Sequence, residues 1–521
     1  MTRTGVPSVQ NIGAPRLTAG FDRFHRLDLA GHRAVHGELP MLSAGDTIEL
    51  ADRIRLRGRG GAGFPFARKV GAVLDSATSR SAGVTVVVNA TEGEPASWKD
   101  KVLLTRAPHL ILDGAAIAGY ALKARSIVVG VTDDGIGMPS VLAALAERRM
   151  PAPTRVVTMP HRFISGEGGA LIQGINGQVP IPPGRKTRAS DSGVGGMPTL
   201  LSNAETYAQL SIAARLGPDG YAAVGTVAEP GTVLLTVGGC ARRPAVVETP
   251  TGVPLADVLQ MCAADPGPGV LLGGFHGKWV SAYAAARAVV SHEGLAEAGG
   301  TLGAGIILPL GPGTCALGEA TRVVQYLAGQ SAGQCGPCRL GLPDLGRAMA
   351  GLVAGTGGGS IDAIRAAAAA VRGRGACSHP DGTSRLAISA LEAFTEDVAA
   401  HLMRGGCGLP VRNVLPVPGA ARTGSARLVV DWARCDGHGL CAHIVPELIQ
   451  LDANGYPSFP DTPVPTWLEP SARKAIAMCP ALALRLARGH RRSRRAAAHS
   501  TSRASLGTRA GIRGGRSGED T

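Results

Sequence analysis

Apolar positions over the first 225 residues follow two alternating patterns. β-Branched runs at 84–88, 126–132 and 154–158 predict buried parallel strands, which read as nearly continuous apolar stretches. Between these runs, apolar residues recur at helical spacing over 109–124 and 139–150. Strands and helices that alternate in this way predict a doubly wound α/β domain. We expect its ligand site at the carboxyl ends of the strands.

The pattern changes after residue 230. Two runs around a Gly-rich turn, at 231–240 and 243–248, predict a pair of strands, and 253–261 and 269–274 predict a short helix and a further strand. Later stretches are helical up to about residue 410, and a strand is expected at 427–431. We therefore divide the chain into an N-terminal arm (1–52), an α/β domain (53–225), a small β-rich domain (226–290), a helical domain (300–410), a small α+β domain (426–486) and a basic tail (487–521).

A glycine-rich loop precedes the first strand. Four glycines fall within six residues and are followed by Phe64 and Lys69; they are Gly58, Gly60, Gly61 and Gly63. Glycine is costly in regular structure, so this density indicates a place where the backbone approaches a ligand closely. Backbone N–H groups and nearby cations suit an anionic cofactor. A flexible Gly-Arg linker is the alternative interpretation.

Two polar loops follow strands of the same domain. The first contains Asn89, Glu92 and Glu94, and the second contains Gly166 and Glu167. Both positions correspond to the strand ends at which open α/β sheets bind ligands. Solvated loops without a function are the alternative.

Cysteines cluster in two places. Cys335 and Cys338 form a C-x-x-C on a turn entering a helix, and Cys377 can supply a third thiolate. A redox-active cysteine pair is the alternative. Near the end of the chain, Cys435, Cys441 and Cys479 also have ligand spacing, with zinc as the alternative to an iron–sulfur cluster. Cysteines in ligand spacing argue for a reducing compartment.

These motifs and the segment ending in Asn203 occur in the order found in one family. Residues 25–410 resemble the flavin-carrying, NADH-oxidising subunit of respiratory complex I and its relatives in hydrogenases and formate dehydrogenases. The resemblance implies FMN, NAD(H) as substrate, a β-grasp domain at 226–290 and an iron–sulfur cluster on the helical domain. It implies a nicotinamide-facing, catalytic role for Glu94, which also lies at the cofactor. It implies FMN contacts for Gly58, Gly60, Gly61, Gly63, Phe64, Lys69, Asn89, Glu92, Gly166, Glu167 and Asn203.

The chain departs from this family in four places, one of which is Ala72, where the family has an aromatic residue after the lysine. Glu167 is followed by Gly168 where the family has a second glutamate, which removes a like-charge barrier to a 2′-phosphate. The basic loop 184–188 stands where the family has an aromatic one. Both changes leave NADP(H), or a redox partner other than a nicotinamide nucleotide, open. Ala332 occupies the position of a fourth cluster cysteine, so a [3Fe–4S] cluster, a [4Fe–4S] cluster with a different fourth ligand, or no cluster remain possible there.

The segment 426–486 is similar to the single-cluster ferredoxins of actinobacteria. Many of these proteins partner cytochromes P450 and carry [3Fe–4S] clusters, which implies a three-iron cluster on Cys435, Cys441 and Cys479. His438 takes the place of a middle cysteine and is either a ligand or solvent-facing.

Charge and hydropathy add little to this interpretation. The formal charge is +14, and about half of the excess lies in the tail, where Gly, Ser, Ala and Arg without periodicity predict disorder. We expect a solvated end there and not a nucleic-acid site. No apolar run is long enough to span a bilayer, and we expect a cytoplasmic protein. The predicted function is a flavin–iron–sulfur NAD(P)H oxidoreductase whose ferredoxin passes electrons to a P450 or another one-electron acceptor. A non-catalytic electron-transfer or scaffold subunit is the alternative.

Overall fold

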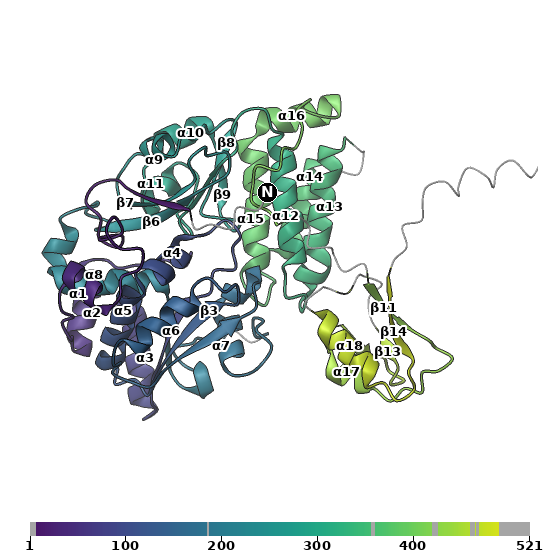
Figure 1. Ribbon diagram of the computed structural model, residues 1–521. Coiled ribbons are helices and arrows are strands. Elements are labelled where there is room, and N and C mark those ends of the chain that lie inside the picture. Colours follow the sequence, from purple (N-terminus) through teal and green to yellow (C-terminus); the bar gives the residue numbers. More distant parts are fainter. Residues whose placement is uncertain are drawn as a thin grey trace, which may run out of the picture. The chain divides into compact units, whose positions relative to one another are not determined.

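A computed structural model describes residues 7–184, 187–355, 360–418, 426–446, 448–458, 464 and 468–488. The chain forms two compact units, residues 1–420 and 421–521 (Figure 1). Two residues of the predicted basic loop, 185 and 186, and the predicted tail from 489 onward lie outside the described residues. Within the described ranges, we find no helix with the length and apolar character needed to cross a membrane.

A four-stranded parallel sheet forms the centre of the first domain. Its strand order is β4-β3-β2-β5, and the strands are β2 (Thr85–Ala90), β3 (Ser126–Thr132), β4 (Thr154–Met159) and β5 (Thr199–Asn203). Neighbouring strands pair in parallel throughout. The predicted strands at 126–132 and 154–158 are confirmed, as is the alternation of strands with helices.

Helices cover both faces of this sheet, because successive residues of a strand point to opposite sides. Val86 and Val88 pack into the larger core with α5 and α8, whereas Val87 packs into a smaller core with α7. The helices of this region are α1 (Leu29–His36), α2 (Ala44–Arg53), α3 (Phe66–Ser79), α4 (Lys99–Arg106), α5 (Pro108–Ala121), α6 (Met138–Ala146), α7 (Gly168–Ile175) and α8 (Ala204–Ala222), with short 3₁₀ turns η1 (Phe163–Gly166) and η2 (Val194–Gly196).

A second, six-stranded sheet follows, with the order β1-β7-β6-β10-β8-β9. Its strands are β1 (Ser8–Asn11), β6 (Thr232–Val237), β7 (Ala245–Pro250), β8 (Gly269–Leu272), β9 (Lys278–Ser281) and β10 (Ile306–Pro309), and its helices are α9 (Leu255–Met261), α10 (Ala282–Arg287) and α11 (His292–Glu297). Strand β1 comes from the predicted N-terminal arm and pairs with β7 at the sheet edge. Strand β10 lies beyond residue 290, so this sheet extends past the predicted β-rich segment on both sides.

Helices complete the described part of the first unit. They are α12 (Ala316–Gly329), α13 (Leu342–Val353), α14 (Ile361–Val371), α15 (His379–Ala393) and α16 (Thr395–Arg404), with a π turn, η3 (Pro337–Gly341), before α13. Those labelled α12, α13, α14 and α15 lie side by side in Figure 1. Helix α15 packs against β9. The C-x-x-C motif of Cys335 and Cys338 lies at η3, which leads directly into α13, so it enters a helix as the sequence predicts.

The second unit is a small α+β fold. Strands β11 (Ala426–Val430) and β14 (Leu484–Arg488) pair antiparallel, and so do β12 (Gln450–Leu451) and β13 (Pro457–Ser458). Helices α17 (Leu440–Ile444) and α18 (Glu469–Ala477) complete it. Its core is small and includes the partly buried Cys435, Cys441 and Cys479.

Candidate functional site

Two asparagines mark the carboxyl edge of the parallel sheet. Asn89 of β2 and Asn203 of β5 are register partners on neighbouring strands. Asn203 also caps α8, because its Oδ1 accepts a hydrogen bond from the Glu205 N–H at 3.0 Å. The end of the sheet and the start of a helix therefore meet at this point, which is the expected ligand position in an open α/β sheet.

The glycine-rich loop lies against this edge. It closes as a small hairpin in which the Gly58 N–H donates to the Phe64 carbonyl at 2.9 Å. A Cβ atom at Gly60 would lie 3.2 Å from the Cβ of Asn203, closer than ordinary van der Waals contact, so the loop packs tightly on the sheet edge. Gly61 and Gly63 have φ values of +115° and +60°, which side chains disfavour. Phe64 is 44% exposed at the outside of the loop.

A half-buried cation and unpaired hydroxyls lie near the same edge. The Lys69 Nζ donates to the Leu201 carbonyl at 3.0 Å, and burial lowers the pKa of this ammonium group. The hydroxyls of Ser165 and Ser202 are buried, with no hydrogen-bond partner among the described residues. Buried polar groups normally have partners. Unpaired hydroxyls beside a bare glycine backbone fit a polar cofactor with an anionic group, such as FMN.

The second polar loop reaches the same place from η1. The Asn89 Nδ2 donates to the Gly166 carbonyl at 2.9 Å. Glu167 caps α7 by accepting a hydrogen bond from the Ala170 N–H at 2.8 Å. A Cβ atom at Gly168 would lie 2.8 Å from the Leu201 Cδ2, so a side chain there needs Leu201 to move. The structure thus brings Gly60, Asn89, Gly166 and Asn203 together.

Glu92 has a different position from the other predicted FMN contacts. Its side chain is 5% exposed and caps α4: the carboxylate accepts hydrogen bonds from the Ser97 hydroxyl and from the N–H groups of Asp100 and Lys101. Burial, and then the charge of Asp100, raise the pKa of Glu92 to about 7. Both of its oxygens are engaged by the protein, so Glu92 shapes the loop from beneath.

Glu94 lies between the flavin domain and the turn after β8. Its Oε1 accepts a hydrogen bond from the Phe275 N–H at 2.8 Å, and a Cβ atom at Gly274 would lie 2.9 Å from its Oε2. Burial, with a smaller contribution from Glu92, raises the pKa of Glu94 to about 8. Burial therefore favours the protonated form of this carboxyl group, which can donate a hydrogen bond.

A buried ionic network supports Asn203, and the sequence interpretation missed it. Lys99 is 2% exposed, and its Nζ lies 2.8 Å from Asp100, 3.1 Å from Glu205 and 3.1 Å from the Asn203 Oδ1. Burial alone would lower the pKa of Lys99, but the two carboxylates raise it. Asp100 also accepts a hydrogen bond from the Asn203 Nδ2 at 2.6 Å. The one local signal is a charged pair, Lys99-Asp100, directly before an apolar helical run.

Three cysteines of the helical domain lie near one another. Burial and the neighbouring Cys335 raise the pKa of Cys338, which also contacts the Ser331 hydroxyl. Burial raises the pKa of Cys377 to about 11, with contributions from Glu167 and Cys335. Ala332, three residues before Cys335 in the sequence, is also buried. Burial thus disfavours the free thiolates of Cys338 and Cys377, and a cationic centre at this place would stabilise them.

The loop at η1 connects the flavin edge to these cysteines. The Arg162 Nη2 donates to the Ser331 carbonyl at 3.3 Å, and the Phe163 N–H donates to the Gln330 Oε1 at 3.2 Å. Glu167 caps α7 at one side of the loop. At the other side, its negative charge helps to raise the pKa of Cys377. A single short segment therefore contacts both predicted cofactor sites.

In the second unit, Cys435, Cys441 and Cys479 line one small cavity together with His438. Gly437 and Gly439, with φ values of +69° and +68°, flank His438 and form the turn between the first two cysteines. The Cys479 Sγ accepts a hydrogen bond from the Ala483 N–H at 3.4 Å, and burial raises the pKa of Cys441. Three thiols around one cavity fit an iron–sulfur cluster.

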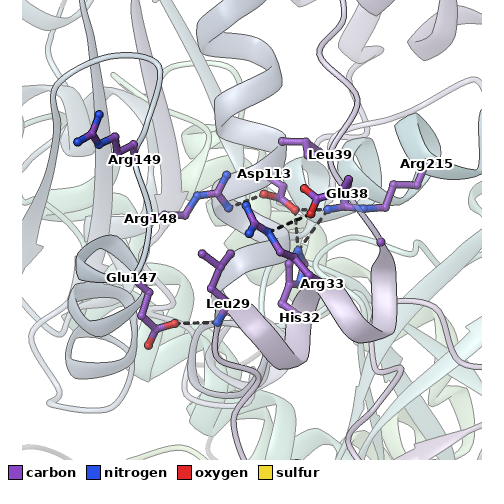
Figure 2. A pocket seen from close by; sticks show the side chains of 11 residues that line it. Leu29, His32, Arg33, Glu38, Leu39, Asp113, Glu147, Arg148, Arg149 and Arg215 are labelled. Carbon is purple, nitrogen blue, oxygen red and sulfur yellow. Dashed lines mark hydrogen bonds and ion pairs between the residues drawn. The ribbon is translucent and has the colours of Figure 1, made fainter.

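A cavity of about 320 Å³ lies apart from these residues, between α1, α5 and α8 (Figure 2). Its polar wall is internally paired. Asp113 accepts hydrogen bonds from Arg148, from Arg215 at 2.5 Å and from His32 at 2.7 Å, and Arg33 pairs with Glu38. This arrangement ties the N-terminal helix to the flavin domain.

Three family models match successive parts of the chain. Residues 51–212 match the Nuo51 FMN-binding domain, residues 318–401 match the iron–sulfur binding region of NADH-ubiquinone oxidoreductase F, and residues 428–486 match a 4Fe-4S single cluster domain. The chain therefore carries an FMN-binding domain and an iron–sulfur region similar to those of NADH oxidoreductase flavin subunits, followed by a domain similar to single-cluster ferredoxins. The predicted resemblance is confirmed in both parts.

Named relatives agree with this assignment. The chain is 27% identical to the F 2 subunit of NADH-quinone oxidoreductase of Rhizobium meliloti over 72% of this chain and 93% of the relative. It is 24% identical to HndC, a subunit of the NADP-reducing hydrogenase of Solidesulfovibrio fructosivorans, over 80% and 86%. It is 30% identical to the alpha subunit of the NAD-reducing hydrogenase HoxS of Cupriavidus necator over 71% and 63%.

A solved structure shares the fold. An NAD⁺-reducing [NiFe]-hydrogenase in its air-oxidised state superposes with a TM-score of 0.66 at 24% sequence identity, over 76% of this chain and 68% of the other.

Proposed function

We propose that this protein oxidises a reduced nicotinamide nucleotide with FMN and passes the electrons singly to its own iron–sulfur centres. The observation that carries the proposal is the convergence on one sheet edge of the glycine-rich loop, the pair Asn89 and Asn203, and the loop at Gly166. These segments are far apart in sequence and meet at the carboxyl end of β2 and β5. FMN, when bound, supplies the exchange between hydride transfer and one-electron transfer.

The residues at this sheet edge would contact FMN in different ways. The glycine-rich loop offers bare N–H groups, Lys69 offers a cation, and Ser202 offers an unpaired hydroxyl. The Lys99 network fixes Asn203 from beneath, so the side chains at the edge are preorganised before the ligand arrives.

Glu94 is proposed to orient the nicotinamide side of the substrate. Because Phe275 N–H occupies its Oε1, its proton is available at Oε2 for a hydrogen bond to a carboxamide or ribose oxygen. Its placement against the turn after β8 means that the six-stranded sheet takes part in positioning it. The proposed role is binding and orientation, with the proton held on the carboxyl group.

We further propose that the chain accepts NADPH as well as NADH. Gly168 leaves Glu167 as the one carboxylate of this loop, so repulsion of a 2′-phosphate is reduced. The relative HndC is a subunit of an NADP-reducing hydrogenase, which is consistent with use of NADP(H) by proteins similar to this chain. The matched test compares Gly168→Glu with Gly168→Ala, because both add a Cβ beside Leu201 and only one adds charge. We expect kcat/KM for NADPH to fall at least about tenfold in Gly168→Glu relative to Gly168→Ala, or roughly 1.4 kcal/mol. An equal NADPH rate in the two variants would contradict the charge argument.

The cysteine groups would hold the one-electron carriers. Cys335, Cys338 and Cys377 would ligate a cluster with three protein thiolates, and Cys435, Cys441 and Cys479 would hold a second one, which we propose is [3Fe–4S]. The ferredoxin domain suits a soluble one-electron acceptor, and a cytochrome P450 is the acceptor we propose. Being tethered, the ferredoxin domain is present at an effective concentration of about a millimolar.

The deciding experiment is an anaerobic titration of the purified protein, with flavin, iron and sulfide quantified, by NADH and NADPH. We expect loss of flavin absorbance together with a change in the EPR signal of a cluster. Bound FMN and clusters that neither nucleotide reduces would favour the second candidate, a relay or scaffold subunit. The departures at Gly168 and Ala332 are the observations that favour that candidate.

A further inference from the structure

A third group of potential ligands lies in the helical domain, apart from the two predicted cluster sites. Cys315 caps the start of α12, His401 lies near the end of α16, and Cys407 follows α16. Their ligand atoms all lie within 4.8 Å of one another, and the Cys315 Sγ is 3.3 Å from the His401 Nε2. Residues separated by 86 positions along the chain thus meet at one point.

These side chains have few other partners. Cys315 and His401 are buried, and Cys407 is half-buried. Among the described residues, Cys315 is the hydrogen-bond partner of the His401 ring, and the His401 Nδ1 is buried without a partner. Cys315 packs in the main core of the helical domain, whereas Cys338 belongs to a separate small cluster with Leu342 and Val371. The group is therefore distinct from the predicted iron–sulfur site.

Two thiols and an imidazole are the ligand set of a single soft or borderline cation. Zinc bonds of about 2.0–2.3 Å in tetrahedral geometry hold ligand atoms within about 4 Å of one another. The spacing of this group is close to that range, and the ligand types favour zinc over magnesium or calcium. We propose that Cys315, His401 and Cys407 bind one zinc ion, with a water molecule in the fourth position.

The zinc ion has a structural role in this proposal. After α16, the chain runs back along the start of α12: the Cys315 N–H donates to the Pro410 carbonyl at 2.9 Å, and the Arg412 and Val414 N–H groups donate to Thr314 and Glu319, each at 3.1 Å. The cation joins α12, α16 and this returning segment at their common point. The segment precedes the ferredoxin unit in the sequence, so zinc fixes the place from which that connection begins.

The test measures zinc and iron by mass spectrometry in the full-length protein, purified anaerobically. We expect about one zinc per chain in the wild type, and at least a fivefold loss in Cys407→Ser and in His401→Gln with iron unchanged. Cys240→Ser is the matched control and should keep its zinc, because Cys240 lies outside all three groups. X-ray absorption at the zinc edge, which iron does not affect, should show two sulfur ligands at about 2.3 Å and one nitrogen ligand at about 2.0–2.1 Å.

A second measurement uses the wild-type chain, so that its result does not depend on whether the variants fold. Removal of zinc with a chelator should increase hydrogen exchange in residues 407–414, while FMN and iron are retained. Three results would overturn the proposal: a wild-type protein without zinc, zinc that is retained in Cys407→Ser and lost in Cys335→Ser, or a Cys315–Cys407 disulfide in the native protein. A failure of NAD(P)H oxidation would leave this proposal intact, because its readouts are metal content and local exchange.

Discussion

The Arg59 guanidinium lies 2.8 Å from the Glu229 carboxylate, and the two side chains are 4% and 6% exposed. Arg59 belongs to the glycine-rich loop, and its backbone N–H donates a hydrogen bond to the Thr206 hydroxyl at 2.9 Å. Glu229 also pairs with the His292 Nδ1 at 2.7 Å. Although burial alone would raise it, His292 and Arg59 lower the pKa of Glu229 to about 2. A loop rich in glycine is therefore fixed from beneath by a buried ionic chain.

Breaking this pair should destabilise the protein and release the flavin. Arg59→Met leaves the Glu229 carboxylate buried beside His292 alone, and loss of one partner of a buried pair costs about 3–5 kcal/mol. Urea unfolding followed by circular dichroism measures the loss, and flavin fluorescence measures cofactor release. The double variant Arg59→Met/Glu229→Met is the control, since it removes both charges and should recover most of the stability. A single variant as stable as the wild type would show that the pair is dispensable.

Close packing of the loop on Asn203 gives a second prediction. Gly60→Ala places a methyl group 3.2 Å from the Asn203 Cβ, closer than ordinary van der Waals contact, so Asn203 or the loop has to give by a few tenths of an ångström. We expect the Kd for FMN to rise by about tenfold, or roughly 1.4 kcal/mol, measured by fluorescence titration of the apoprotein. Gly71→Ala is the control: its Cβ meets nothing within 4 Å inside α3, so stability should increase by about 0.5–1 kcal/mol and FMN affinity should not change. Unchanged FMN affinity in Gly60→Ala would mean that the loop does not contact the cofactor.

The sequence predicted strands and motifs well, but not the roles of polar residues in their loops. Strand β3 has the predicted bounds because a β-branched run carries its own signal. The resemblance implies an FMN contact for Glu92, and the structure adds that Glu92 caps α4. The sequence did not reveal this second role, because a capping carboxylate and a ligand carboxylate have the same local pattern. Strand β1 is short, mostly exposed and stabilised by β7, more than 230 residues away, so no local signal marks it. The meeting of Cys315 with His401 likewise depends on tertiary packing.

Restoring the fourth family cysteine should alter the cluster of the helical domain. Ala332 is buried and stands three residues before Cys335, the position at which the resemblance implies a fourth ligand, so Ala332→Cys would offer a further thiolate. We expect the EPR signal of a three-cysteine cluster to convert to that of a [4Fe–4S] cluster, with iron content increased or unchanged. Cys377→Ala is the opposite control and should lose this signal. An Ala332→Cys spectrum identical to that of the wild type would show that this position does not reach the cluster.

His438 can be tested independently in the ferredoxin domain. It lines the cavity of Cys435, Cys441 and Cys479, but a [3Fe–4S] cluster needs only the three thiolates. His438→Ala should therefore keep its iron and its oxidised-state EPR signal, whereas Cys441→Ala should lose both. Loss of iron in His438→Ala would identify a histidine-ligated four-iron cluster.

The raised pKa of Glu94 predicts how stability depends on pH. A carboxyl group with a folded-state pKa of about 8 binds its proton more tightly when folded than when unfolded, where its pKa is about 4.3. Its contribution to stability is therefore complete below the unfolded value and is lost as pH rises through about 8.

Glu94→Gln cannot lose a proton and keeps an oxygen for the Phe275 N–H, so its stability does not fall in this way as pH rises. The Tm of Glu94→Gln relative to wild type should rise by several degrees between pH 5 and pH 8.5, because the charged form is disfavoured in the folded wild type alone. Glu92 titrates in both proteins and largely cancels in the difference, and Glu297→Gln, at an exposed site, should show no such change. A difference in Tm that is constant with pH would mean that Glu94 is ionised in the folded protein, and its proposed role as a hydrogen-bond donor to the substrate would then be wrong.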